Sequence, residues 1–316
     1  MTNEPSHWSQ HKESGTLRGI LFLLWLHRWF GRGLFNLILL PIAVYFFVFN
    51  GVARRASTEF LKTHAACYPA YWKKTPNYFT VIRHFYSFGQ SILDKLLAWS
   101  TPIVEADFEF VNPDLLAEFM LKQSGQLIIG SHLGNLEFCR GFILRNKEKT
   151  INALVYDQHS ANFVNAMQSL NPASRINIYQ VNQLDIPLIL QLKSKIDAGE
   201  WLFIAGDRIP LSGNERTLTV NFFDRPTQFA IGPYMLAKVL QCEVQLMFSY
   251  RTAKKIRFDL VPFADQVVLP RKDDGTQLTA YVQQYATELE RQAAKAPLQW
   301  FNFFPYWEQS SSASKL

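Results

Sequence analysis

Residues 127–141 read LIIGSHLGNLEFCRG. It opens with an apolar run typical of a buried strand, which ends abruptly at a glycine, a serine and His132. Five residues later Glu137 opens a second apolar pattern, this one with helical spacing. We therefore expect a strand over 126–132 and a helix over 136–147, joined by a loop that carries the histidine.

The same alternation continues along the chain. We predict further strands over 151–157, 176–181, 201–207, 217–223, 244–251 and 256–263, and helices over 160–170, 186–199, 232–241 and 276–296. Alternating strands and helices indicate an α/β fold, a mostly parallel sheet flanked by helices. In such sheets, sites gather in the loops after the strands, and both His132 and Asp207 stand there.

The composition points to an apolar partner. Aromatic residues make up 15% of the 316 residues, and charged residues only 18%, below the usual quarter of a soluble protein. The three cysteines, Cys67, Cys139 and Cys242, lie far apart without metal-binding spacing, so we interpret them as buried thiols in a reducing compartment.

The net charge of +6 is concentrated near the N-terminus. Residues 18–83 hold a single acid, Glu59, and nine basic residues: Arg18, Arg28, Arg32, Arg54, Arg55, Lys62, Lys73, Lys74 and Arg83. A basic surface attracts either nucleic acid or anionic lipid. Because this one flanks segments rich in Phe, Trp and Leu, we favour an anionic membrane surface and expect no nucleic-acid partner.

Two apolar runs, 20–30 and 34–49, lie inside this basic region. A cleavable signal peptide is disfavoured, because the first run starts late and no small-residue cleavage site follows it. Two membrane arrangements fit: a single N-terminal span with Arg54 and Arg55 on the cytoplasmic side, or a pair of interfacial helices. The alternative is a buried hydrophobic hairpin in a soluble domain.

These patterns divide the chain into five parts. They are a polar segment (1–19), a hydrophobic membrane anchor (20–50), a basic helical region (51–102), an α/β domain (103–307) and a disordered tail (308–316).

The spacing of His132 and Glu137 suggests acid–base chemistry. Five residues apart on one helix, the two side chains would diverge, so we place His132 in the loop and Glu137 in the first helical turn. Gly134 supplies a tight backbone and Asn135 a helix cap. The carboxylate would then orient the imidazole as a general base, while amides at the helix start meet an oxyanion or a phosphate.

Other readings of these residues remain open. The histidine is a cap beside an ordinary glutamate in one of them, and Ser131 is a nucleophile paired with His132 in another. We predict no metal, because the spacing is not HExxH and no third ligand is evident.

The stretch around His132 resembles a motif of a known family. SHLGNLE is similar to the H-x4-D/E signature of glycerolipid and lipid A acyltransferases, and the closer likeness is to the bacterial lauroyl/myristoyl transferases of lipid A biosynthesis. ALVYD, FIAGDR, FFDRPTQFAIGPYMLAK and the C-terminal PLQWFNFFPYW follow in the family's order. The resemblance covers most of the chain, from the hydrophobic anchor onward.

The resemblance implies roles for individual residues. His132 would deprotonate the acceptor and Glu137 would orient His132. Asp207 would bind or position the acceptor, and Arg208 would contact phosphate or the acyl carrier. We place Gly134, Asn135 and Phe223 with these last two among the substrate-binding residues. Asp157 stands where lipid A transferases commonly have an arginine, which puts lipid A itself in doubt as acceptor.

We therefore expect a membrane-attached enzyme that moves a fatty acyl group from an acyl-carrier-protein or CoA thioester to a lipid hydroxyl or amine. It would need no cofactor beyond this acyl donor. The resemblance implies a bacterial inner membrane location with the catalytic domain facing the cytoplasm. The alternatives are an esterase that uses the same His/Glu pair on water, and a non-catalytic lipid-binding protein.

Overall fold

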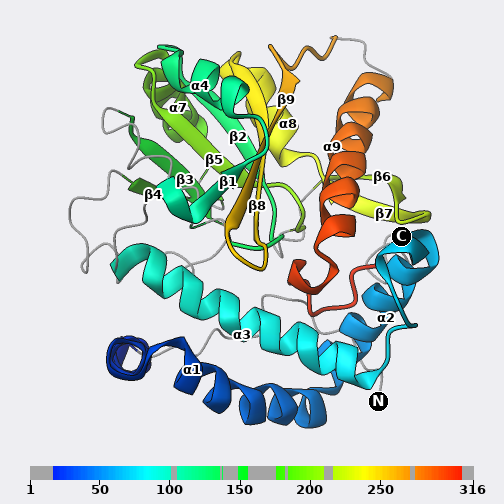
Figure 1. Cartoon of the computed structure of the whole chain (residues 1–316). Helices are drawn as coiled ribbons and strands as arrows, with labels where there is room; N and C mark the ends of the chain where they lie inside the picture. Colours follow the sequence, from blue (N-terminus) through cyan, green and yellow to red (C-terminus); the bar gives the residue numbers. More distant parts are fainter. Residues whose placement is uncertain are drawn as a thin grey trace.

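The computed structural model of the chain describes residues 17–100, 105–135, 137, 149–155, 176–181, 184–209, 216–270 and 275–307. Its main sheet contains β1 (Phe108–Phe110), β2 (Gln126–Gly130), β3 (Ile151–Val155), β4 (Ile176–Gln180), β5 (Trp201–Ala205), β8 (Glu243–Arg251) and β9 (Ile256–Ala264). The strand order is β1-β9-β8-β2-β5-β3-β4 (Figure 1), and every neighbouring pair is parallel except β8 and β9. The predicted α/β class with a mostly parallel sheet is confirmed.

Helices cover both faces of this sheet, which explains why its central strands are apolar throughout. On β2, Leu127 and Ile129 point into one core, and Ile128 points into the core on the other face. The first core packs against α7 (Ile186–Asp197), α8 (Gly232–Leu240) and α9 (Thr276–Lys295), and the second against α4 (Pro113–Leu121). Successive side chains of a strand point to opposite faces, so both must be apolar when both faces are covered.

A small antiparallel hairpin of β6 (Thr217–Phe222) and β7 (Arg225–Ala230) packs beside α9. Its two-residue turn places Phe223 and Asp224 at φ 53° and 54°, a left-handed conformation that lets the hairpin close. The sequence analysis predicted β6 but missed β7, β1 and α4. The predicted helices over 136–147, except residue 137, and over 160–170 lie outside the described residues, as does the whole tail 308–316.

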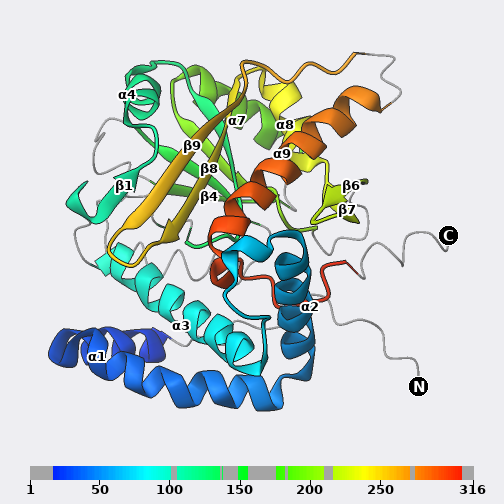
Figure 2. The same cartoon turned by 45° about the vertical axis from the view of Figure 1, so that its right-hand side comes forward.

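Three long helices precede the sheet: α1 (Leu17–Phe49), α2 (Gly51–Cys67) and α3 (Tyr78–Ser100). Short 3₁₀ turns lie between α2 and α3 at Pro69–Tyr71, before β1 at Glu105–Asp107 and after α9 at Pro297–Gln299. Both views place α3 between α1 and the sheet (Figures 1 and 2). The predicted helical character of this region is confirmed.

The break between the two apolar runs is a kink at Gly31, whose φ of 66° and ψ of −168° are not helical. The two halves of α1 therefore run in different directions (Figure 1). The second half packs on α3, where Gly89 leaves room for the Leu39 side chain. The polar Asn36 is matched there by Gln90, whose Nε2 donates to the Asn36 side-chain oxygen at 3.3 Å.

The outward face of α1 is apolar. Residues His27–Phe49 have a mean hydropathy of 1.9 and form the one helix, within the described part of the chain, that is long and apolar enough to cross a membrane. Its exposed large apolar side chains, together with Trp25 from the preceding turn, are Trp29, Phe30, Leu37, Ile38, Leu40, Ile42, Val44, Tyr45, Phe46, Val48 and Phe49. A helix that served only as part of a soluble core would bury such a face.

Candidate active site

The ends of two neighbouring strands bring His132 and Asp207 together. β2 pairs with β5 up to Gly130 and Ala205, and the Gly206 amide then donates to the Gly130 carbonyl at 3.0 Å. One residue further on, the Asp207 carboxylate accepts from the imidazole, with 2.7 Å between Oδ1 and Nδ1. Its second oxygen, Oδ2, accepts from the His132 backbone amide at 2.9 Å. The sequence-based expectation that both residues lie at this edge of the sheet is confirmed.

Asp207 is enclosed by the C-terminal segment of the chain. Trp300 Nε1 and Asn302 Nδ2 each lie 3.3 Å from its Oδ2. The Tyr306 hydroxyl donates to its backbone carbonyl at 2.8 Å. None of the Asp207 side-chain surface is exposed. The carboxylate is thus fully hydrogen-bonded inside the protein, as a buried charge requires.

The imidazole of His132 faces outward from this arrangement, with 30% of its side chain exposed. Because a carboxylate only accepts hydrogen bonds, the proton must lie on Nδ1. The lone pair is therefore on Nε2, the ring nitrogen away from Asp207. This tautomer and orientation suit a general base.

The electrostatics keep Asp207 ionised and His132 neutral near pH 7. Burial tends to raise the pKa of Asp207, but the charge and hydrogen bonds of His132 and the nearby Arg208 outweigh it and lower the pKa to about 2. Burial and the charge of Arg208 lower the pKa of His132, while Asp207 opposes them. A base is effective in its neutral form, so the site is ready to accept a proton.

The loop after His132 depends on Gly134. Its φ is 66°, and a Cβ atom there would collide with the Ser249 carbonyl of β8. Its amide donates to the Gln299 carbonyl at 2.7 Å. Asn135 is tied to the same strand, since its amide donates to the Ser249 carbonyl at 3.2 Å and its carbonyl accepts from Ser249 Oγ at 2.7 Å.

The amides of this loop are already used within the protein. The Leu133 amide donates to Ser131 Oγ at 3.3 Å, and the Glu137 amide donates to Asn135 Oδ1 at 3.1 Å. With the amides of His132, Gly134 and Asn135, this makes five described N–H groups with internal acceptors. The prediction that the described amides here meet an oxyanion or a phosphate is therefore not supported. Residue 136 and the residues from 138 to 148 lie outside the described part.

Glu137 stands apart from the Asp207 contact. Its Oε1 lies 3.9 Å from Lys95 Nζ on α3. The carboxylate that binds Nδ1 of His132 is that of Asp207, so the orienting contact expected of Glu137 is made by Asp207 instead. Asn135 Nδ2 also reaches α3, where it donates to the Ser91 carbonyl at 3.2 Å. The site therefore lies on the α3 side of the sheet, which is also the side of α1 (Figure 2).

Arg208 is held by the C-terminal segment. Its Nε donates to Asn302 Oδ1 and its NH2 group to the Phe301 carbonyl, both at 2.9 Å, and its guanidinium lies 5.7 Å from the centre of the Phe304 ring. Because it adjoins Asp207, it adds positive charge to the site.

Phe223 is placed elsewhere. Its side chain is fully buried at the tip of the β6–β7 hairpin, in ring contact with Phe60, His64 and Tyr68. These contacts join the hairpin to α2, and the substrate-binding role expected of Phe223 stays a prediction.

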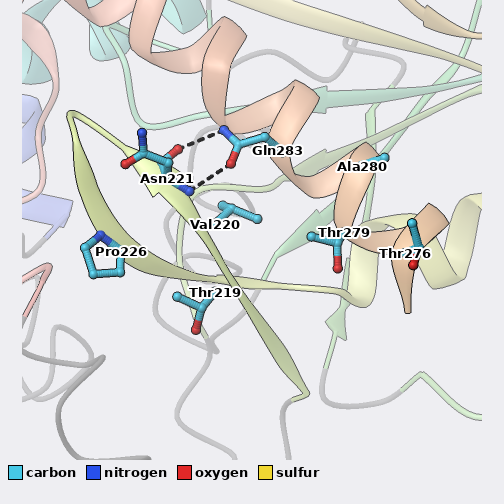
Figure 3. A pocket seen from close by; sticks show the side chains of 8 residues that line it. All are labelled: Thr219, Val220, Asn221, Pro226, Thr276, Thr279, Ala280 and Gln283. Carbon is cyan, nitrogen blue, oxygen red and sulfur yellow. Dashed lines mark hydrogen bonds between the residues drawn. The ribbon is translucent and has the colours of Figure 1, made fainter. Parts of the chain in front are cut away.

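A surface hollow of about 630 Å³ lies between the β6–β7 hairpin and α9 (Figure 3). Gln283 on its wall exchanges two hydrogen bonds with the Asn221 backbone, at 2.8 and 2.9 Å. None of its lining residues takes part in the described hydrogen bonds of His132 or Asp207, so we assign the chemistry to the strand ends and not to this hollow. Among the described residues, no group of three or more His, Cys, Asp or Glu could hold a metal ion.

Sequence reasoning missed Trp300, Asn302 and Tyr306. They are separated from Asp207 by more than ninety residues, and nothing in their spacing points to it. The available signal was a polar residue, Asn302, inside the aromatic run 300–307. A buried amide needs polar partners, and here the partners are the site.

Most of the chain is similar to a known protein family. The family model for bacterial lipid A biosynthesis acyltransferase matches residues 11–309, nearly the whole chain. A search of the curated proteins found no match. The matched range includes His132, Glu137, Asp207 and the C-terminal segment that surrounds Asp207. The chain therefore belongs to the bacterial lipid A biosynthesis acyltransferase family and is an acyltransferase.

Proposed function

We propose that the chain transfers a fatty acyl group from an acyl-carrier-protein or CoA thioester to a hydroxyl or amine of a lipid acceptor, lipid A or a related lipid. His132 Nε2 takes the proton of the acceptor as its oxygen or nitrogen attacks the thioester carbonyl. The carbon–sulfur bond then breaks, and the imidazolium returns the proton to the departing thiolate. The products are an acylated lipid and a free thiol.

The observation that carries this proposal is the 2.7 Å contact between Asp207 Oδ1 and His132 Nδ1, made by a ring that is itself partly exposed. A buried anion that fixes the tautomer and stabilises the imidazolium is the support a general base needs. In this proposal Asp207 is a catalytic partner of His132 and not only an acceptor-binding residue.

Glu137 takes a different part in the proposal. It faces Lys95 on α3, and Asn135 binds the same helix. We assign Glu137 to holding the catalytic loop against α3, and Gly134 and Asn135 to shaping that loop. Arg208, whose charge acts on His132, remains a substrate-binding candidate beside the base.

Attachment to a membrane through α1 is part of this proposal and fits a lipid acceptor. α1, which carries the exposed apolar side chains, packs on α3 (Figure 1), and Asn135 of the catalytic loop binds the same helix α3. A helix embedded in the inner membrane would hold His132 near lipid headgroups at the cytoplasmic surface. The basic residues of the N-terminal helices would attract anionic lipid and an acidic acyl carrier protein by the same electrostatics.

The proposal is tested by single-turnover transfer of a radiolabelled acyl group from acyl carrier protein, and separately from CoA, into total membrane lipid. The products are resolved by chromatography for wild type, His132→Ala and Glu137→Ala. We expect label in one lipid and a loss of about 10²-fold or more in His132→Ala, the range for a general base. We expect a smaller loss in Glu137→Ala.

Other outcomes would reject the proposal. Label found only in free fatty acid identifies a hydrolase. Equal transfer by His132→Ala and wild type would show that His132 is a capping residue.

A further inference from the structure

Three N–H groups converge on one oxygen of the Asp207 carboxylate. They are the His132 amide at 2.9 Å, Trp300 Nε1 at 3.3 Å and Asn302 Nδ2 at 3.3 Å, and all three reach Oδ2. The other oxygen, Oδ1, contacts His132 Nδ1. Oδ2 is therefore held by three donors, and Oδ1 is the oxygen that contacts the imidazole.

The segment that supplies two of these donors is itself fixed from both sides. The Phe301 amide donates to the His132 carbonyl at 3.2 Å. On the other side, the Trp300 carbonyl lies 3.2 Å from Nε2 of the buried His84, whose Nδ1 lies 2.8 Å from Ser57 Oγ. Since a carbonyl only accepts, His84 donates through Nε2 and accepts from the serine. Trp300 is thus held between α2, α3 and the catalytic loop.

Gln299, one residue earlier, fixes the same segment to the end of β8. Its Oε1 accepts from the Arg251 amide at 2.9 Å, and its Nε2 donates to the Arg251 carbonyl at 2.7 Å. Asn302 also uses both ends of its amide, since its Oδ1 accepts from Arg208 Nε at 2.9 Å. No freedom to rotate the Asp207 carboxylate is left by these contacts.

We propose that Trp300 and Asn302 are positioning residues of the transfer reaction: they anchor Asp207 Oδ2 and thereby aim Oδ1 at the imidazole. This inference rests on the proposed function of His132 as the base. Neither residue need touch the substrate. Their effect reaches the reaction through the orientation of Asp207 and through the charge that its carboxylate presents to His132.

Other charged and titratable groups face the same pair, and their described hydrogen bonds do not involve the Trp300 indole N–H. They are Arg208 after β5, Lys95 on α3 and the Tyr306 hydroxyl in the C-terminal segment. With one donor gone, Oδ2 carries more unshared negative charge. That charge favours the imidazolium, so the pKa of His132 rises.

The chain offers a matched control for Trp300. Trp201 on β5 is likewise 0% exposed, but its Nε1 has no hydrogen-bond partner among the described residues. Trp300→Phe and Trp201→Phe therefore remove the same atoms from a buried site, and the first alone removes a hydrogen bond to Asp207. The test measures kcat, the KM for acyl carrier protein, and the pH dependence of kcat/KM for both variants in the full-length protein.

We expect Trp300→Phe to lower kcat about tenfold or more, to leave the donor KM unchanged and to move the acidic limb of the pH profile to higher pH. We expect Trp201→Phe to move neither kcat nor the limb. Asn302→Ala provides the same readout should Trp300→Phe fail to fold, with the limb again displaced upward.

Two results overturn the inference. One is equal behaviour of the two tryptophan variants, and the other is a loss of rate with Trp300→Phe that is the same at every pH, which a packing role would give. Failure of the proposed function is recognised separately, because His132→Ala would then match wild type in the same assay.

Discussion

Replacing Asp207 by asparagine tests the tautomer of His132, because the surroundings of the carboxylate dictate which way the new amide points. Three N–H donors meet at Oδ2, so the amide oxygen must occupy that place and the NH2 group must face the imidazole. The NH2 group then donates to Nδ1, and the histidine proton moves to Nε2. In this form His132 has no lone pair to offer the acceptor.

The size of the effect follows from those three donors. Turning the amide around would leave three buried N–H groups without an acceptor, at about 1 kcal/mol or more each. A total of about 3 kcal/mol keeps the inactive arrangement favoured by about 150-fold. Loss of the negative charge that stabilises the imidazolium adds about another tenfold, so we expect a rate about 10³-fold below wild type.

Asp207→Ala is the informative comparison. It removes the charge but leaves the tautomer free, so most of the tautomer penalty of about 150-fold is absent and it should transfer roughly 10²-fold faster than Asp207→Asn in single-turnover assays. Nitrogen NMR of ¹⁵N-histidine-labelled protein should show the Nδ1–H form of His132 in wild type and the Nε2–H form in Asp207→Asn. The reasoning is refuted if Asp207→Asn is as active as Asp207→Ala, or if its imidazole keeps the proton on Nδ1.

Three further predictions concern other parts of the structure. Burial lowers the pKa of His84 to about 3, below its value in the unfolded chain. The protein therefore loses stability as the pH falls below about 6.5, because the unfolded chain then binds a proton that the folded protein does not. In denaturant titrations, His84→Gln should reduce the drop in unfolding free energy between pH 7.5 and 5 by about 2 kcal/mol. The buried Asp94 carboxylate accepts hydrogen bonds from Arg32 of α1 and, at 2.6 Å, from Arg251 of β8. Asp94→Asn should lower the free energy of unfolding by about 1–3 kcal/mol and make α1 more sensitive to limited proteolysis. Unchanged cleavage would contradict this role. Gly134→Ala should cut transfer about 10²-fold by displacing the catalytic loop, while Gly232→Ala, whose added Cβ meets nothing within 4 Å, should stay near wild type in the same assay.

The sequence predicts the architecture well because the burial of the strands follows directly from their composition. The run 127–130 has to be apolar on both faces, since helices cover both sides of the sheet. Placing His132 and Asp207 in loops after two strands then brings them to one edge. Their contact depends only on β2 and β5 being neighbours, which the parallel topology makes natural.

The rest of the site depends on contacts that spacing does not encode. The H-x4-E pattern suggests Glu137 as the partner of His132, but the chain reaches Nδ1 from Asp207, 75 residues away. Trp300 and Asn302 arrive from the C-terminal segment because the turn after α9 returns it to the end of β8. β7 was missed because it starts at Arg225–Pro226, and proline is rare in paired strands except at edges, where β7 lies.

The most direct test of His132 as the general base is the transfer rate of His132→Gln at saturating acylated carrier protein. Glutamine keeps a polar side chain in the loop but has no nitrogen that can take up the acceptor's proton. We expect a fall in kcat of about 10²-fold or more, with the donor KM unchanged and the protein still folded. A kcat within about threefold of wild type would contradict the role of His132 as the base.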